Sequence, residues 1–372
     1  MKKYRLLEDV CEILDSQRIP ITASERKTGG YPYYGANGIQ DYVDNYIFDD
    51  DLVLLAEDGG NFGSRDKPIA YRVSGKCWVN NHAHVLKPKS TINVDYLCYT
   101  LMFYDTTGLV NGATRQKLTQ SAMRQMKIPF VKMDVQNKIV KKINLVVDLI
   151  GKRKKQLEKF DELVKSRFIE MFGDPEENTF FWKEQPLSEH LSVIGGYAFK
   201  SDQFSKGGIP VLKIGNINSG TFKPVNLVYW EDDDTLSRYK MYPGDLVMSL
   251  TGTVGKDDYG NVCILGNDYD VYYLNQRNAK LELCDTLNKY YLSMLLKFEP
   301  IKKKLTGISR GVRQANISNK DILNLTVPIP PIELQNQFAA FVEQVDKSKS
   351  EIKQGLEKLE LLKKALMQKY FG

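Results

Sequence analysis

The sequence predicts an α+β protein in which two mixed α/β heads are joined by two long antiparallel α-helices, and two observations carry this prediction. The chain contains an internal repeat, because residues 112–173 and 311–372 show the same markers in the same order. Each copy also ends in a long stretch that holds one apolar stripe at helical spacing and lacks proline. These stretches predict two matching long helices, one after each head.

The repeat begins at an Arg-Gln pair, which is Arg115-Gln116 in the first copy and Arg313-Gln314 in the second. A Leu-Thr or Ile-Ser pair follows, and then an apolar residue with proline, a Gln-Asn pair and a closing Phe-Gly. A chance match would not keep this register over about sixty residues, so the two halves are expected to fold alike.

The heads diverge more than the helices, but both contain short β-branched runs separated by Gly, Asn and Asp, which are typical of strands with tight turns. The predicted boundaries are 1–130 for the first head, 131–173 for the first helical spacer, 174–329 for the second head and 330–372 for the second spacer.

The apolar stripes predict that the two helices pack against each other or against partner proteins, because a long narrow stripe needs a helix to cover it. A helix of about forty residues spans roughly 60 Å, so the first helix carries the chain from one head to the other. The second helix must run back to pair with it, and the pair is therefore antiparallel. The predicted packing residues are Val146, Ile150, Leu157, Phe160, Val164, Phe168, Val345, Ile352, Leu356, Leu359 and Leu366.

Composition favours a cytoplasmic protein without a membrane segment. The 52 Lys and Arg residues exceed the 46 Asp and Glu residues by six, a mild excess that suits a basic patch for a polyanion. No apolar run is long enough to span a membrane, and the N-terminal segment carries charges where a signal peptide would be apolar. The five cysteines form no CxxC pair, and His82 and His84 lack a third ligand at suitable spacing, so no metal site is predicted.

No catalytic motif accompanies this architecture. The segment Thr251–Lys256 resembles a phosphate-binding loop, but its spacing is short, and Asp257 stands where a hydroxyl should bind magnesium. No nucleophile elbow, kinase signature or dinucleotide fingerprint is present. The sequence therefore predicts a binding protein with two similar, non-identical sites and no cofactor of its own.

Double-stranded DNA is the predicted ligand of a mildly basic protein with two binding heads. Two sites on one face of B-DNA are separated by about 34 Å or a multiple of it, and a helix of roughly 60 Å can set that distance. Arg reads guanine, Asn and Gln read adenine, and Lys contacts phosphate, so the candidates are loop residues of these types. In the first head they are Tyr34, Asn37, Asn61, Arg65, Asn81, Asn111, Arg115 and Gln116. In the second head they are Lys213, Asn216, Asn218, Lys256, Asn275, Arg277, Arg310, Arg313 and Gln314.

The whole chain resembles the specificity subunit of a type I restriction-modification system, in which head, long helix, head and long helix follow in this order. The segments that carry the resemblance are IPVLKIGNI, GDLVMSLTGTVGK, LNQRNAKL, SRGVRQANIS and VPIPPIELQNQF, with weaker copies in the first half. The first head departs most, since Asp58-Gly59-Gly60 replaces the usual Ser/Thr-Gly pattern.

The resemblance implies that each head is a target-recognition domain that reads one half of a bipartite, asymmetric DNA site, while the helices set the gap. It implies a non-catalytic subunit that docks two methylation subunits, with restriction subunits added in the full complex. S-adenosylmethionine, ATP and Mg²⁺ would then bind to the partner subunits rather than to this chain.

Three alternatives remain open at this stage. The chain could be the specificity subunit of a type II-like restriction-modification system, in which one partner combines methylation and cleavage. It could also be a stand-alone two-headed DNA-binding regulator, which would not need apolar stripes for partners. A nuclease is the third alternative, and it requires a metal-binding carboxylate cluster that the sequence does not display.

Overall fold

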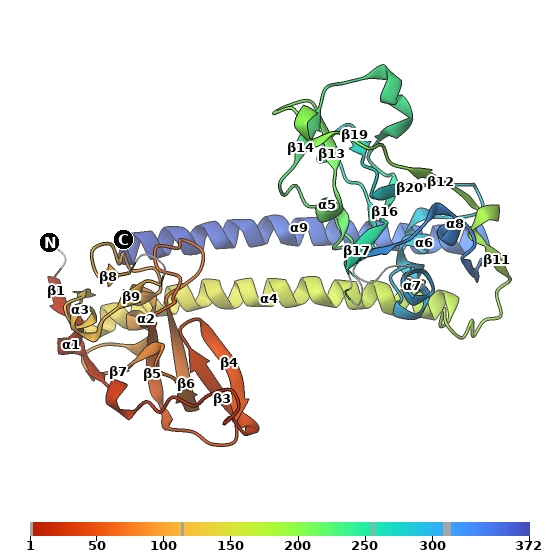
Figure 1. Cartoon of the computed structure of the whole chain (residues 1–372). Helices are drawn as coiled ribbons and strands as arrows, with labels where there is room; N and C mark the ends of the chain where they lie inside the picture. The colour runs from red at the N-terminus through yellow and green to blue at the C-terminus, as the bar shows by residue number, and fades with distance from the viewer. Residues whose placement is uncertain (1–2, 113–114, 254–255, 257, 308–313) are drawn as a thin grey trace. The chain divides into compact units, whose positions relative to one another are not determined.

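The computed structural model describes residues 3–112, 115–253, 256, 258–307 and 314–372, and it contains two compact units. Unit 1 comprises Met1–Lys154 with Gln354–Gly372, and unit 2 comprises Lys155–Lys353. Two uninterrupted helices of 40 residues each, α4 (Met133–Phe172) and α9 (Ile332–Phe371), contribute one part to each unit (Figure 1). The predicted pair of long helices and the mixed α/β heads are confirmed.

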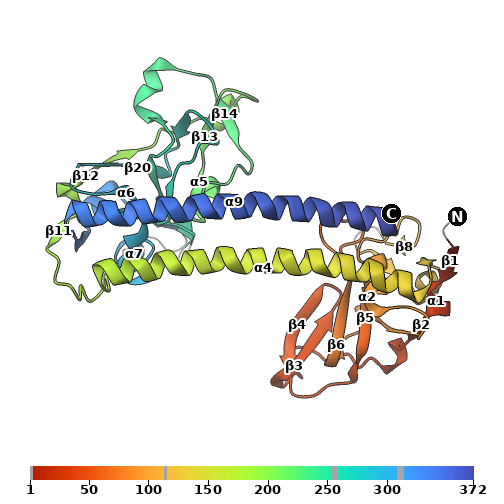
Figure 2. The same ribbon diagram turned by 180° about the vertical axis from the view of Figure 1, so that it is seen from behind.

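Unit 1 is built on a six-stranded sheet with the order β2-β7-β5-β6-β3-β4 (Figure 2). Its strands are β2 (Cys11–Ile13), β3 (Thr28–Gly35), β4 (Gly38–Val43), β5 (Phe48–Ala56), β6 (Ala70–Val79) and β7 (Ala83–Pro88). Neighbouring strands are antiparallel except β3 and β6, which are parallel. The central strand β5 is apolar throughout Leu52–Ala56, as expected where both faces of a sheet are covered. Leu52 and Leu54 enter one core, and Val53 and Leu55 enter the other, because side chains alternate along a strand.

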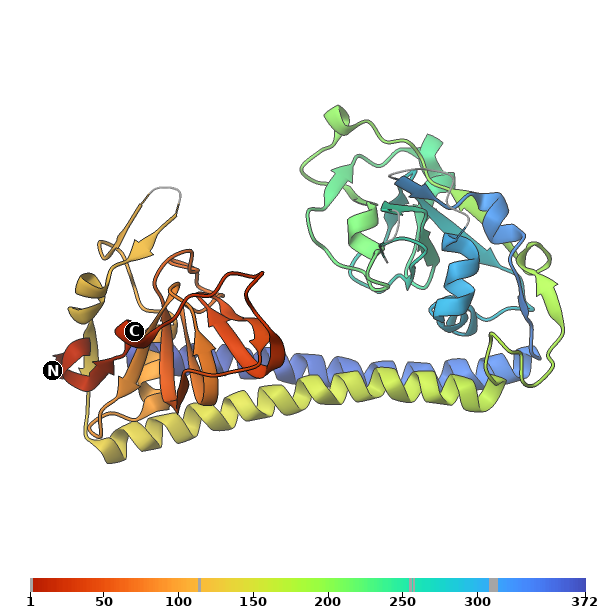
Figure 3. The ribbon, with the colours of Figure 1, turned by 60° about the horizontal axis from the view of Figure 1, so that its bottom comes forward.

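Short elements complete unit 1 around this sheet. The strands are β1 (Lys3–Leu6), β8 (Val110–Asn111), β9 (Lys117–Leu118) and β10 (Lys127–Phe130); the helices are α1 (Leu7–Val10), η1 (Asp15–Gln17), α2 (Val94–Met102) and α3 (Gln120–Arg124). Strand β1 pairs with β10, and β8 pairs with β9 in a hairpin that projects from the sheet (Figure 3). This hairpin carries the Arg-Gln pair of the first repeat.

Unit 2 contains two four-stranded sheets, with the orders β12-β20-β16-β18 and β14-β13-β19-β15, and the two-stranded pairs β11-β22 and β17-β21. Its strands are β11 (Glu184–Pro186), β12 (Leu191–Gly195), β13 (Ile209–Leu212), β14 (Val228–Trp230), β15 (Lys240–Met241), β16 (Leu246–Ser249), β17 (Thr251–Thr253), β18 (Val262–Ile264), β19 (Tyr272–Leu274), β20 (Asn278–Leu283), β21 (Gln314–Asn316) and β22 (Thr326–Pro328). Its helices are η2 (Leu187–Glu189), η3 (Ser201–Gln203), α5 (Ile214–Ile217), η4 (Asp234–Tyr239), α6 (Lys289–Leu295), α7 (Glu299–Thr306) and α8 (Asn319–Leu323).

The repeat seen in the sequence is a repeat of hydrogen bonds in the structure. Gln136 is fully buried, and its Oε1 accepts from the backbone N–H of Asn93, the residue that caps α2, at 2.8 Å. Gln335 is equally buried and accepts from the backbone N–H of Asn288, the cap of α6, also at 2.8 Å. Gln136 therefore ties the start of α4 to α2, and Gln335 ties the start of α9 to α6.

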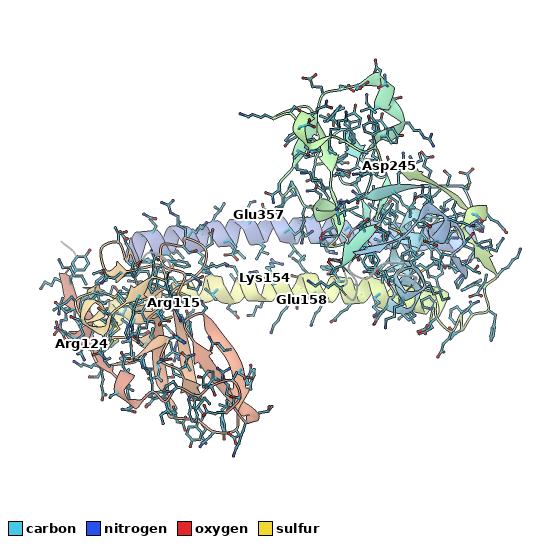
Figure 4. All side chains as sticks on the ribbon, viewed as in Figure 1. Arg115, Arg124, Lys154, Glu158, Asp245 and Glu357 are labelled. Carbon is cyan, nitrogen blue, oxygen red and sulfur yellow. The ribbon has the colours of Figure 1, made fainter. Side chains whose placement is uncertain are left out.

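The two long helices run antiparallel within each unit. In unit 1, Lys154 of α4 pairs with Glu360 of α9 at 3.4 Å, and the C-terminal end of α9 packs into the core that holds the beginning of α4. Figure 4 marks Lys154 on α4 and Glu357 on α9. In unit 2, Lys349 pairs with Asp161 at 2.6 Å, and Phe338 meets Phe168 edge to face. The residue numbers fall along α9 as they rise along α4, which confirms the predicted direction.

The predicted packing residues lie on the inner sides of these helices to different depths. Those that are buried are Val146, Ile150, Phe168, Val345 and Ile352. Those that are partly buried are Leu157, Phe160, Val164, Leu356, Leu359 and Leu366. Within the described residues, no helix combines the length and the apolar character that crossing a membrane requires.

Candidate nucleic-acid interface

In the first head, the structure brings several of the predicted DNA-binding residues together around the loop that follows β5. Asn37 donates from Nδ2 to the carbonyl of Gly59 at 3.0 Å, and Asn61 donates to Asn37 Oδ1 at the same distance. The N–H of Gly59 in turn donates to the carbonyl of Gln116 at 3.2 Å. Gly59 has φ of +61°, a conformation that glycine adopts without strain. Three chain segments therefore meet at this glycine.

Arg115, which Figure 4 labels, lies between β8 and β9, and its side chain reaches the same loop. Its Nη2 donates to Asp58 Oδ1 at 2.7 Å, while most of its side chain stays exposed. His82 Nδ1 lies 2.7 Å from the same carboxylate oxygen and 3.2 Å from Arg115 Nη2. The three side chains are therefore in mutual contact, and we call Asp58, His82 and Arg115 the head-one cluster.

Beneath the head-one cluster lies a buried ionic network. His84 Nδ1 contacts Asp15 at 2.7 Å, and its Nε2 contacts the carbonyl of Leu118 at 2.9 Å. Arg18 reaches Glu57 at 2.7 Å. Burial raises the pKa of Asp15, but hydrogen bonding and charge from His84, helped by Arg18, outweigh it, and the pKa lies below its usual value.

The ligand atoms of Asp15, Glu57 and His84 lie within 4.8 Å of one another, as metal ligands do. The guanidinium of Arg18, however, already contacts both carboxylates, and a cation would be repelled there. This network instead fastens β9, and with it the Arg115 hairpin, to the core of unit 1.

The other candidates of the first head do not join the head-one cluster. Arg65, Asn81 and Asn111 are exposed on separate loops and strand ends. Tyr34 is half-buried and stacks on Tyr71, and burial raises the pKa of its hydroxyl. These four residues remain surface candidates without a shared geometry.

In the second head, strand β17 pairs with β21, which begins at Gln314 of the second Arg-Gln pair. Thr251 Oγ1 donates to Asn316 Oδ1 at 2.7 Å across this pair, and Asp258 accepts from the N–H and hydroxyl of Thr253 at 2.8 and 2.9 Å. Arg310 and Arg313 lie outside the described residues, as does the side chain of Gln314. The backbone of Gln314–Asn316 is thus paired with strand β17.

Asn216 is a correction to the predicted interface. Only 1% of its surface is exposed, and its Nδ2 donates to the carbonyls of Lys223 and Val225, both at 2.9 Å. Its Oδ1 accepts from the N–H of Lys213 at 2.9 Å. All its hydrogen-bonding groups organise the loop after α5, so Asn216 has no free edge for a base.

The remaining candidates of the second head are spread over its surface. Lys213 is half-buried with its ammonium over the ring of Phe204, and Asn218 is half-buried with its carbonyl bound by Asn261. Asn275 is half-buried, whereas Arg277 and Lys256 are exposed. Lys256 stands at a cavity of about 1350 Å³ in unit 2, which is also lined by side chains from α4, α7 and α9.

Sequence reasoning did not connect Asp58 and His82 with Arg115. The sequence suggests a role for His82 only as a metal ligand, and it shows Asp58 only as a departure from a Ser/Thr-Gly pattern. Their partner Arg115 is 57 residues from Asp58 and 33 from His82, so the sequence carried no local signal for the cluster. The arrangement places a guanidinium and side-chain amides around one loop, and these are groups that can read base edges.

Comparison with known proteins places both halves of the chain in one family. The family model described as "Type I restriction modification DNA specificity domain" matches residues 2–159 and again residues 181–362. A putative type I restriction enzyme specificity subunit of Haemophilus influenzae is 28% identical, over 95% of this chain and 90% of that protein. The MjaVIII specificity subunit of Methanocaldococcus jannaschii is 25% identical, over 96% of this chain and 89% of that protein.

Solved structures show the same fold. The S subunit of a type I restriction-modification system from M. genitalium aligns over 100% of this chain and 96% of its own, with a TM-score of 0.61 and 14% identity. A chain from a type I system studied for complex assembly and conformational transition aligns over 99% and 97%, with a TM-score of 0.54 and 17% identity.

Proposed function

This chain belongs to the type I restriction-modification DNA specificity family, and we propose that each of its heads reads one half of a bipartite, asymmetric DNA sequence. The observation that carries the proposal is the double match of the family model, once to each half of the chain. A specificity subunit with two different heads would recognise two different half-sites, because the candidate base-reading residues of the two heads differ.

Contacts in the first head support this role. Arg115 is exposed and held in place, and Asn37 and Asn61 lie in one hydrogen-bonded array with the same loop. Arginine binds guanine and asparagine binds adenine through paired hydrogen bonds in the major groove, each worth about 1–3 kcal/mol of discrimination. In the second head, the matching segment is anchored by the β17–β21 pair.

The long helices would dock the methylation subunits. Large apolar side chains remain exposed on them, among them Leu145 at 61% and Leu361 at 65%. Leu149, Leu163 and Leu362 are also exposed. A surface of this kind on a long helix is typical of a protein–protein interface. Two methylation subunits would bring S-adenosylmethionine, and restriction subunits would bring ATP and Mg²⁺, so this chain would supply recognition without catalysis.

Methylation mapping tests the proposal. The chain is co-expressed with its cognate methylation subunit, and host DNA is sequenced for N6-methyladenine. We expect one interrupted motif that disappears when this chain is omitted. Absence of any chain-dependent motif, with a folded and S-adenosylmethionine-binding methylation subunit, would refute the proposal and favour a stand-alone DNA-binding protein.

A second experiment tests whether the helices set the gap between half-sites. Removing one heptad from α4 and the facing heptad from α9 shortens both helices by about 10 Å, which corresponds to about three base pairs of B-DNA. We expect the gap to shorten while both half-site sequences persist. An unchanged gap with altered half-sites would contradict this role of the helices.

A further inference from the structure

Asp58 is an unusual residue for a DNA-facing surface, because its negative charge opposes the phosphate backbone. Its side chain is only 18% exposed, and its Oδ1 lies 2.7 Å from both Arg115 Nη2 and His82 Nδ1. Removing an acidic group from such a place should strengthen binding to any DNA, unless the group has a second role. The geometry of the head-one cluster indicates what that role is.

Arg115 Nη2 donates to Asp58 and also lies 3.2 Å from His82 Nδ1, whereas Nε and Nη1 have no partner among the described residues. A free arginine side chain loses rotamer entropy when it is immobilised on a base. A carboxylate that already holds the guanidinium lowers this loss and sets the direction of the remaining donors. His82 Nδ1 contacts the same oxygen at 2.7 Å and so restrains the carboxylate itself.

The backbone around Asp58 is tied to the hairpin that carries Arg115. Asp58 forms a β-bridge with Lys117, and the Gly59 N–H donates to the carbonyl of Gln116. A side chain on Gly59 would stand 3.6 Å from Arg115 Nε, in ordinary contact with it. The carboxylate and the guanidinium are therefore presented by two segments held in register.

We propose that Asp58 is a specificity-determining positioning residue of the first head, which orients Arg115 for one guanine of the first half-site. This inference rests on the proposed function and adds a residue to it. Asp58 acts through Arg115 and does not itself contact the base. The remaining N–H groups of Arg115 would bind O6 and N7 of guanine in the major groove.

The test uses the complete complex with its methylation subunits and a set of DNA duplexes that vary each base of the first half-site. Asp58→Ala should lower discrimination at one position by about tenfold, within the range set by one bidentate contact. Its affinity for non-specific DNA should stay the same or rise, because a negative charge is removed. The second half-site should keep its preference, which shows that the complex remains folded.

Asp66→Ala is the matched control, since Asp66 carries a charge on the same loop and is exposed. It should leave discrimination unchanged. Asp58→Asn keeps an oxygen that accepts from Arg115, and it should retain most of the discrimination that Asp58→Ala loses. If the alanine variant fails to fold, Asp58→Ser, which removes the carboxylate with a smaller change in polarity, replaces it.

A double-mutant cycle separates positioning from other roles. In an Arg115→Ala background, Asp58→Ala should cause no further loss of discrimination. An equal loss in both backgrounds, or full discrimination by Asp58→Ala alone, would overturn the inference. A wild-type complex without any sequence preference would instead refute the proposed function, so the two failures are distinguishable.

Discussion

Gln335 offers a direct measure of how the long helices are fastened to their heads. Its side chain is fully buried at the start of α9 and makes three hydrogen bonds. Oε1 accepts from Asn288 N–H at 2.8 Å, and Nε2 donates to the carbonyls of Pro330 at 2.8 Å and Thr286 at 3.3 Å. Gln335→Ala removes all three hydrogen bonds at once, so the N–H of Asn288 and the carbonyls of Pro330 and Thr286 lose this partner.

The expected cost follows from these contacts. A hydrogen bond contributes about 1 kcal/mol net, and the groups left unpaired add more unless water reaches them. We therefore expect Gln335→Ala to lower the free energy of unfolding of unit 2 by about 3 kcal/mol. This corresponds to a change of about two orders of magnitude in the unfolding equilibrium constant.

Urea unfolding followed by hydrogen exchange in each unit provides the assay. With a slope of about 2–3 kcal/mol per molar urea, the midpoint of unit 2 should fall by roughly 1 M. Gln337→Ala, an exposed substitution on the same helix, is the control and should shift the midpoint little. Equal effects of the two substitutions would refute the reasoning, because burial and hydrogen bonding would then not set the stability of this joint.

Three further predictions follow from other features. Phe371→Ala should destabilise unit 1 by about 2 kcal/mol, measured by urea unfolding, because the ring packs edge to face on Tyr96 in a partly buried site; an unchanged midpoint would contradict this packing. Burial raises the pKa of four of the five thiols to about 11 or 12, so a thiol reagent at pH 8 should modify one cysteine rapidly, the exposed Cys284, and the others only after unfolding; rapid reaction of more than one would argue against it. Since the pKa of Asp15 is lowered in the folded state, its stabilising contribution is present above the ordinary carboxyl pKa near 4 and is lost as the pH falls. Unit 1 should therefore lose stability on acidification more steeply than an Asp15→Asn variant, and parallel profiles would show that this carboxylate is not responsible.

The long helices could be predicted from the sequence because their signal is local. Apolar residues three, four and seven apart, together with the absence of proline, specify a helix wherever that segment lies. The repeated Gln-Asn pair likewise marked the start of each helix, and the structure shows both glutamines in the same hydrogen-bonding role. The direction of pairing followed from the length of the helices and the order of the heads.

The candidate interface was predictable only in part. Residue type led to loops in both heads, but it could not distinguish an asparagine that faces solvent from one that holds its own loop. Asn216 belongs to the second kind, because its amide bonds to the backbone of its own loop. Asn37 is exposed and bonds to residues of a different loop, since it donates to Gly59 and accepts from Asn61. A side-chain amide can hydrogen-bond equally well to a ligand in solvent or to the backbone of its own loop, and burial of the side chain decides between the two.

The sequence by itself determined the repeated architecture, the two long helices and the family of this protein, because periodicity and ordered motifs are properties of the chain. Only the tertiary structure decided that Asp58 and His82 meet Arg115, since these residues come from three separate segments. Such a cluster forms through backbone pairing between distant strands and loops, and no local spacing encodes which side chains that pairing brings within 3 Å.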